Sequence, residues 1–512
     1  HDWLLRQRWF RGKARELVAL ELADHAYLAA GNGSRLLLAT VRVRYTEGDP
    51  EEYLLPLSFR PPPGEEADAV PLLTFLGETG EIRLYEALLD KHTSTMLLEA
   101  VEQERAVQSS YGSYQGLRTN VLEEISGSRN PVRRVESEQS NTSIIFGDQL
   151  ILKVFRKLEK GLNPDLEVTR FLTEQTDFSS LPRLAGWIEH ESDDGSRSAV
   201  AGLFEYVVNK GEAWSYTLRA LNRYFAAASR SAADPTTTSG REATRRMAGD
   251  YLASARRLGG VTGELHAALA SADSSHPDFV AEPIGTDEVS QWVQDFQKNA
   301  AVSLREVGQR LEAIPGLFPA AILNDIAAVV RDAPSILARM GDLQILQDAG
   351  ARRIRFHGDY HLGQLIRRAE ARPGGGDEWV ILDFEGEPAR PLAVRREKHS
   401  PLRDVAGMMR SFNYSVRMAL AEQEVESDLV RSSLEAWAEA WEREVRSLFL
   451  QGYREAVAGT NLIPEEEEIL MQVLSVFELE KAIYELGYEM NNRPDWIWVP
   501  VQGIRGIMEK RA

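Results

Sequence analysis

Short alternating runs of hydrophobic and polar residues occupy the first 90 residues and predict strands. Residues 35–45 end in strict apolar–polar alternation, and a second run, residues 51–58, follows a polar turn. An alternation of period two gives a strand one face for a core and one face for solvent. We therefore predict a small β-rich N-terminal cap over residues 1–90.

The hydrophobic runs become continuous and β-branched after residue 130. Residues 142–146 and 150–155 are apolar runs joined by a Gly-Asp-Gln turn, which is the pattern of a β-hairpin. Asn163 followed by Pro164 is a helix-start signal, and a further strand is expected over residues 199–208. These elements predict an N-terminal lobe over residues 91–208.

Helical periodicity dominates the rest of the chain. Apolar residues recur every three to four positions from residue 209 to about 345 and again over 402–512. The small and polar stretch 227–240 is interpreted as a surface insertion, with a functional loop as the alternative. We predict a helical C-terminal lobe over residues 209–512, so the fold class is α+β with two lobes and a cap.

Charge and composition narrow the classes of function. The 512 residues include 59 basic and 78 acidic ones, a net charge of −19, and such a surface repels nucleic acid and anionic membranes. The absence of cysteine excludes disulfides and thiolate catalysis. No apolar run approaches the ~20 residues of a membrane span, and the start lacks a signal-peptide pattern. We expect a cytoplasmic enzyme with a small substrate and with neither nucleic acid nor a membrane as partner.

Residues suited to phosphoryl transfer gather in segments 356–364 and 380–386. His-Gly-Asp ends at Asp359, Gln364 follows five residues later, and a second apolar run ends at Asp383. Phosphoryl transfer needs a carboxylate that orients the acceptor hydroxyl and hard oxygen ligands for Mg²⁺ near the phosphates. We predict that Asp359 is the catalytic carboxylate, that Gln364 and Asp383 bind Mg²⁺, and that the phosphoryl donor is a nucleoside triphosphate.

Two histidines in the first segment admit another interpretation. His357 and His361 have the i, i+4 spacing of zinc ligands, but the glutamate of a metalloprotease motif and a third ligand are missing. We interpret His357 as a residue that shapes the loop. His361 either does the same or lies beside the substrate.

The ordered motifs resemble those of a known superfamily. His-Gly-Asp, an amide five residues later and an Asp-Phe-Glu strand end are similar to the aminoglycoside phosphotransferase branch of the protein-kinase-like superfamily. That branch usually has Asn where this chain has Gln364, and the Gln form resembles bacterial maltokinases and their glucosamine-kinase relatives. The resemblance implies a bilobal protein-kinase-like fold. It also matches Asp404 to the acid that supports the catalytic loop, although Asp404 at a helix start also suits N-capping.

The resemblance also implies a nucleotide site in the N-terminal lobe. Residues 140–143 stand where a glycine-rich phosphate loop would lie, although a polar turn is the alternative. A lone Lys153 among apolar residues is costly unless it meets an anion, and Glu167 is its expected partner or else part of a solvated helix face. The residues predicted to contact ATP are Ser140, Asn141, Thr142, Ser143, Lys153, Glu167, and Glu205 and Val207 at the interlobe hinge.

The acceptor signal lies near the C-terminus. Lys481, Tyr484, Glu485 and Tyr488 have i, i+3, i+4, i+7 spacing and share one helix face. Such a face suits a sugar, although a core stripe is the usual meaning of this spacing. The predicted substrate contacts are His361, Glu385, Lys481, Tyr484 and Tyr488.

Residues 481–500 and 6–15 also resemble maltokinase signatures, so the resemblance spans nearly the whole chain. It implies that ATP and maltose give maltose 1-phosphate for α-glucan synthesis, with trehalose synthase as a fused or separate partner. Two alternatives stay open: a kinase of glucosamine or another amino sugar, and a non-catalytic partner of trehalose synthase.

Overall fold

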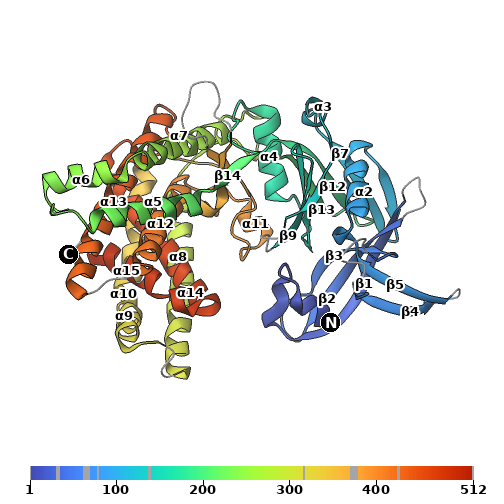
Figure 1. Cartoon of the computed structure of the whole chain (residues 1–512), viewed down its shortest axis with the longest axis horizontal. Coiled ribbons are helices and arrows are strands. Elements are labelled where there is room, and N and C mark those ends of the chain that lie inside the picture. The colour runs from blue at the N-terminus through green and yellow to red at the C-terminus, as the bar shows by residue number, and fades with distance from the viewer. Residues whose placement is uncertain are drawn as a thin grey trace. The chain divides into compact units, whose positions relative to one another are not determined.

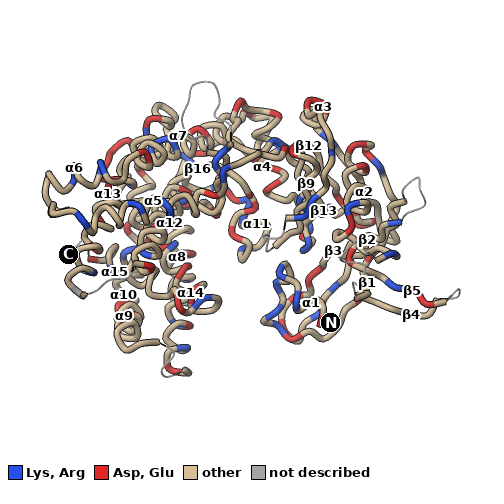
Figure 2. Tube along the Cα trace, in the orientation of Figure 1, with Lys and Arg blue, Asp and Glu red and all other residues tan. Residues whose placement is uncertain are grey.

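The computed structural model describes residues 2–29, 35–61, 70–77, 80–135, 140–314, 318–369, 379–423 and 427–509. The chain divides into two compact units (Figure 1). Unit 1 comprises residues 1–175 and 181–208, and unit 2 comprises residues 176–180 and 209–512. Basic and acidic residues are interspersed along both units (Figure 2).

Unit 1 is built around one antiparallel sheet. Its described strands are β1 (Leu17–Ala29), β2 (Arg35–Tyr45), β3 (Glu51–Ser58), β4 (Leu73–Gly77), β5 (Gly80–Glu86), β6 (Ala106–Ser109), β7 (Gly112–Arg118), β8 (Val132–Arg134), β9 (Asn141–Phe146), β10 (Leu150–Phe155), β11 (Lys157–Leu158), β12 (Leu184–Ser192) and β13 (Arg197–Glu205). Their order is β4-β5-β3-β2-β1-β6-β7-β12-β13-β10-β9-β8, with β11 paired to β3. The strands predicted at residues 35–45 and 51–58 are confirmed as β2 and β3.

One hydrophobic core joins the strands of residues 1–90 to those that follow. The helices of unit 1 are α1 (Asp2–Arg6), α2 (Lys91–Glu102), α3 (Val121–Glu124) and α4 (Pro164–Gln175). Leu97 and Val101 of α2 lie in the same buried cluster as Leu38 of β2 and Leu152 of β10. Because burying each such side chain contributes about 1.5–3 kcal/mol, this cluster holds the strands as one folding unit.

The predicted β-hairpin is present. β9 and β10 pair antiparallel with Phe146 opposite Leu150, and the turn between them uses Gly147 at φ +60°. A Cβ on Gly147 would lie 2.1 Å from the carbonyl oxygen of Ser128, so glycine is required there. The predicted start of α4 is also confirmed, because the side-chain oxygen of Asn163 accepts from the backbone N–H of Asp165 at 2.9 Å.

Unit 2 is mainly helical, as predicted. Its described helices are α5 (Ala213–Ala228), α6 (Thr238–Ala248), α7 (Tyr251–Leu269), α8 (Thr286–Ala313), α9 (Ala320–Arg331), α10 (Ala333–Met340), α11 (Leu392–Arg395), α12 (Leu402–Ala421), α13 (Asp428–Ala456), α14 (Glu467–Asn492) and α15 (Trp498–Glu509). Its strands are β14 (Asn209–Glu212), β15 (Glu282–Pro283), β16 (Arg352–Arg353), β17 (Leu365–Arg368) and β18 (Trp379–Ile381). The fold class is therefore α+β. The polar stretch 227–240 is a loop only in its middle, because α5 ends at Ala228 and α6 begins at Thr238.

Glycine lets two helices of unit 2 approach closely. A Cβ on Gly259 of α7 would lie 1.9 Å from the carbonyl oxygen of Phe449, and one on Gly452 of α13 would lie 2.0 Å from that of Arg256. A glycine inside a helix costs about 1 kcal/mol relative to alanine, so its use at both faces indicates that the close backbone packing outweighs this cost. Within the ranges described above, no helix is both long and apolar enough to span a bilayer.

Candidate active site

A buried aspartate fixes the backbone of the 356–364 loop. Asp404, 2% exposed, accepts from the backbone N–H of His357 at 2.7 Å and of Gly358 at 3.0 Å. Its Oδ2 also lies 3.1 Å from Nε2 of His266. Burial acts to raise the pKa of Asp404, but the hydrogen bonds from His266 and the His357 backbone outweigh it and lower this pKa. The supporting role is confirmed. The capping alternative is wrong, because the carboxylate bonds to the loop.

His357 ties the same loop to the segment that carries Asp383. Its Nδ1 accepts from the backbone N–H of Asp359 at 3.3 Å, and its Nε2 donates to the carbonyl oxygen of Leu382 at 2.8 Å. These partners assign the proton to Nε2 and occupy both ring nitrogens. The loop-shaping interpretation is confirmed, and zinc ligation by His357 has no geometric support.

The two predicted metal ligands lie side by side. β17 pairs with β18 so that Leu365 faces Ile381, and the next residue on each side is Gln364 and Leu382, joined by a backbone hydrogen bond of 2.9 Å. The Gln364 Nε2 donates to Asp383 Oδ2 at 3.1 Å. This orientation commits the amide nitrogen to Asp383 and leaves the amide oxygen as the potential metal ligand.

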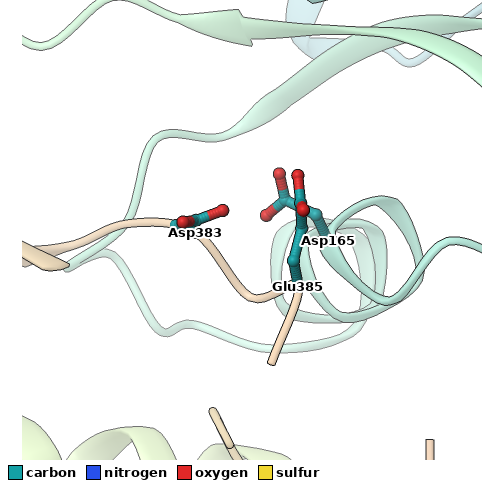
Figure 3. Close-up of side chains that lie close together, drawn as sticks. All are labelled: Asp165, Asp383 and Glu385. Carbon is teal, nitrogen blue, oxygen red and sulfur yellow. The ribbon is translucent and has the colours of Figure 1, made fainter. Parts of the chain in front are cut away.

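Asp383 has an uncommon backbone conformation and an acidic neighbour. Its φ is +65°, a left-handed value that Asp tolerates better than most residues and that is often found at functional sites. One carboxylate oxygen of Glu385 lies within 4.8 Å of one of Asp383; both side chains stand on the segment after β18 (Figure 3). With the Gln364 oxygen, they form a set of hard donors that suits Mg²⁺.

The carboxylate of Asp359 contacts an ammonium from α14. Lys481 Nζ lies 3.2 Å from Asp359 Oδ1 and 2.6 Å from Glu387 Oε1. His361 Nε2 is 4.0 Å from Asp359 Oδ2, while its Nδ1 accepts from the backbone N–H of Gly363 at 3.0 Å. Nε2 of His361 therefore carries the proton and lies on the Asp359 side of the ring.

Glu387 is a site residue that the sequence did not reveal. It is 4% exposed and also bonds to Arg390. Burial disfavours the charged form of both partners, yet Glu387 and Asp359 raise the pKa of Lys481, and Lys481 and Arg390 lower that of Glu387. Lys481 is therefore a charged group that faces Asp359. In the sequence, Glu387 stands between Gly386 and Pro388 and is typical of an exposed turn.

The predicted substrate face of α14 is brought to this site only in part. The Lys481 Nζ lies 4.8 Å from the ring centroid of Tyr484, and burial together with Glu387 raises the pKa of Tyr484 to about 12. Glu485 instead pairs with buried Arg410 of α12 at 2.6 Å. Tyr488 is 45% exposed and packs against Arg493 at 5.3 Å.

In unit 1, Lys153 has an acidic partner that the sequence reasoning missed. Its Nζ lies 3.0 Å from Oδ2 of Asp165, with side chains 13% and 5% exposed. Asp165, also labelled in Figure 3, and the predicted partner Glu167 both belong to the first turn of α4. An acidic residue two positions after Asn163 and in a first helical turn was a usable signal.

The other predicted nucleotide residues are placed as follows. Asn141, Thr142 and Ser143 lie in β9 itself and are buried, and the Thr142 hydroxyl accepts from Arg156 Nε at 2.9 Å. Ser140 lies immediately before this strand. Glu205 ends β13 and pairs with Arg183 at 3.1 Å, and Val207 is a buried residue of unit 1. The contacts of these residues with ATP stay predictions.

Comparisons with known proteins were made on both sequence and structure. Residues 3–90 match the maltokinase N-terminal cap domain. The chain is 24% identical over 379 residues to a glucosamine kinase of Mycolicibacterium smegmatis, covering 74% of this chain and 80% of that one. It is 23% identical over 397 residues to a glucosamine kinase of Streptacidiphilus jiangxiensis, covering 76% and 77%.

Solved structures that resemble this chain include glucosamine kinases, in agreement with the sequence comparisons. A glucosamine kinase in complex with glucosamine, ADP and inorganic phosphate superposes with a TM-score of 0.61 at 19% identity, over 98% of this chain and 96% of that one. A second crystal form of glucosamine kinase gives 0.63 at 18% identity, over 99% and 97%. The predicted kinase-like α+β fold is thereby confirmed. Fold, sequence similarity and site together support an ATP-dependent phosphotransferase of the kinase-like superfamily that acts on a hydroxyl group.

Proposed function

We propose that this protein is a sugar kinase that transfers the γ-phosphoryl group of ATP to the anomeric hydroxyl of maltose and forms maltose 1-phosphate. The observation that carries the proposal is the Asp359 carboxylate on a loop fixed by Asp404, connected to the Gln364–Asp383 pair through His357. The maltokinase cap match supports maltose, and the glucosamine-kinase relatives support a sugar acceptor.

Each residue of the site has a definite task in this reaction. Asp359 accepts a hydrogen bond from the sugar hydroxyl and takes its proton as the oxygen attacks the γ-phosphorus and the bond to the β-phosphate oxygen breaks. Lys481 and His361 hold the Asp359 carboxylate. Gln364 and Asp383, with Glu385 beside them, would hold Mg²⁺, which when bound offsets the negative charge of the phosphates. Lys153 contacts phosphate oxygens in the nucleotide-bound enzyme.

Glucosamine is the second candidate acceptor. Both curated relatives described above carry that name. Glu387 shares Lys481 with Asp359, and the charge of Glu387 is already matched by Lys481 and Arg390. This neutralisation favours a neutral sugar over a protonated amino sugar at the site.

A panel of acceptors tests the proposal. ADP release is measured with ATP, Mg²⁺ and each of maltose, glucose, glucosamine, trehalose and kanamycin, and the products are identified by phosphorus NMR. Maltose is expected to give the highest kcat/KM and an anomeric phosphate. A higher kcat/KM for glucosamine would replace maltose by the second candidate, and no turnover with any sugar would refute the kinase proposal.

A change at Gln364 tests the metal role. Gln364→Leu is expected to raise the Mg²⁺ concentration for half-maximal rate about tenfold or more, because an amide ligand and its bond to Asp383 are both lost. Gln364→Asn keeps the amide and should lie between the two. Gln344→Leu, at an exposed position of unit 2, is the control. An unchanged Mg²⁺ dependence in Gln364→Leu would remove Gln364 from the metal site.

A further inference from the structure

The N-terminal segment of residues 6–15 covers a buried arginine of unit 1. Trp9 of this segment is buried in one apolar cluster with Phe10 and Tyr53. Its ring centroid lies 5.0 Å from Cζ of Arg156, which is 1% exposed. A guanidinium near an aromatic ring is attracted by the ring as well as shielded from water. Neither Trp9 nor Arg156 has a task in the reaction described above.

Arg156 connects the strands of the cap match, residues 3–90, to the hairpin β9–β10. It directly follows β10, and its carbonyl oxygen accepts from the backbone N–H of Leu54 in β3 at 2.8 Å. Its Nη2 donates to Oε1 of Glu86, the last residue of β5, at 2.9 Å. Its Nε donates to the hydroxyl of Thr142 in β9, also at 2.9 Å. One residue thus joins β3 and β5 to β9.

The ion pair between Arg156 and Glu86 is a costly way to stabilise a fold. Among the residues that the structure describes, Nη1 of Arg156 and Oε2 of Glu86 are buried without a hydrogen-bond partner. Unfilled polar groups carry a desolvation cost, and apolar side chains of similar volume often stabilise as well as a buried ion pair or better. What the pair supplies is direction, because a planar guanidinium that bonds to Glu86 and Thr142 at once fixes where β9 lies.

Thr142 stands beside residues that are predicted to contact the nucleotide. In the β9–β10 ladder Thr142 lies opposite Val154, and the next pair is Ser143 opposite Lys153. Lys153 is itself held by Asp165 at 3.0 Å. A shift of β9 therefore moves Ser143 relative to Lys153. Charge-assisted hydrogen bonds to phosphate oxygens are short and directional, so such a shift weakens them.

We propose that Arg156 is a positioning residue for the nucleotide, which holds β9 where the phosphates of ATP require it. Through Glu86 and Trp9, this role makes the affinity for ATP depend on residues 3–90. The inference rests on the proposed sugar-kinase function. It also gives the segment 6–15 a task, which is to cover Arg156 and keep its hydrogen bonds out of water.

Replacing the buried pair by apolar side chains tests the positioning role. Arg156→Met/Glu86→Leu is expected to raise the Kd of ATP, measured by calorimetry, and the KM for ATP about tenfold, because Thr142 loses its donor. The kcat at saturating ATP and the KM for maltose should stay within about twofold. The urea midpoint should stay close to that of the unmodified protein, because no unpaired charge remains buried. Arg156→Lys keeps the charge without the planar fork and should have an intermediate Kd.

The matched control removes a buried charge from another part of unit 1. Asp24 of β1 is 5% exposed, accepts from the Ser109 hydroxyl at 2.6 Å and lies 2.8 Å from Nε2 of His190. Asp24→Asn should lower the urea midpoint more than the double variant does, while the Kd of ATP stays within about twofold. Trp9→Leu, a change in residues 3–90 alone, should raise the Kd of ATP about threefold.

The outcomes separate this inference from the function it rests on. If the unmodified protein phosphorylates a sugar but the double variant keeps its affinity for ATP, the positioning role is refuted and the kinase stands. Equal losses of ATP affinity in the double variant and in Asp24→Asn also refute it, because instability of unit 1 would explain both. If the double variant does not fold, Arg156→Lys and Trp9→Leu decide by the same Kd measurement. If the unmodified protein binds no ATP, the proposed function fails first and this inference falls with it.

Discussion

Asp359→Asn is expected to lower the rate of phosphoryl transfer to maltose by about 10²–10⁴-fold. The amide has nearly the same shape as the carboxylate but cannot take the proton of the attacking hydroxyl. Because Asp404 and His357 hold the loop through its backbone, the loop geometry should survive the change. ATP binding, measured by calorimetry, is expected to be retained, while ADP release in a coupled assay is nearly abolished.

The control for this experiment is a substitution of the same kind at an uninvolved position. Asp348→Asn changes an aspartate of unit 2 that is exposed to solvent and should keep full activity. A fully active Asp359→Asn protein would remove Asp359 from the reaction. Loss of ATP binding together with activity would instead indicate a damaged fold.

Lys481→Met is expected to lower the free energy of unfolding by about 3 kcal/mol, which is a large effect for a single substitution. In the unmodified protein Glu387 is 4% exposed and lies 2.6 Å from the ammonium of Lys481. The substitution leaves this carboxylate buried without that ammonium, and breaking a buried ion pair typically costs about 3–5 kcal/mol. Arg390 still bonds to Glu387, which places the expectation at the lower end. Urea unfolding followed by circular dichroism measures the change.

Two further variants give this prediction its controls. Arg256→Met breaks an ion pair with Glu455 whose side chains are 50% and 51% exposed, and should cost no more than about 1 kcal/mol. The double variant Lys481→Met/Glu387→Gln should be more stable than Lys481→Met alone, because no unpaired charge remains buried. Equal losses in Lys481→Met and Arg256→Met would show that the Lys481–Glu387 contact contributes little.

The sequence predicted the elements and residues whose signals are local. The hairpin β9–β10 follows from two β-branched runs and a glycine turn, and α4 starts at its Asn–Pro signal. Asp359, Gln364 and Asp383 were predicted from their spacing along the chain, and their roles stay predictions. The structure adds that Gln364 and Asp383 are neighbours because β17 and β18 pair.

Contacts that depend on tertiary packing could not be predicted from the sequence. Glu387 looks like part of an exposed turn, and only the approach of α14 buries it against Lys481. The helical spacing of Lys481 and Glu485 correctly indicated one helix face, but spacing alone does not say that Lys481 meets Asp359 whereas Glu485 meets Arg410. The hydrogen bond between Thr142 and buried Arg156, fourteen positions away, likewise has no local signal in the sequence.

The Asp404 anchor has a consequence for which distant residues control the 356–364 loop. Asp404 bonds to His266 of α7, whose other nitrogen lies 3.0 Å from the hydroxyl of Tyr453 on α13. The position of Asp359 is thus set by the tightly packed interior of unit 2. Substitutions of His266 or Tyr453 are therefore expected to disturb the 356–364 loop, although α7 and α13 lie far from it along the chain.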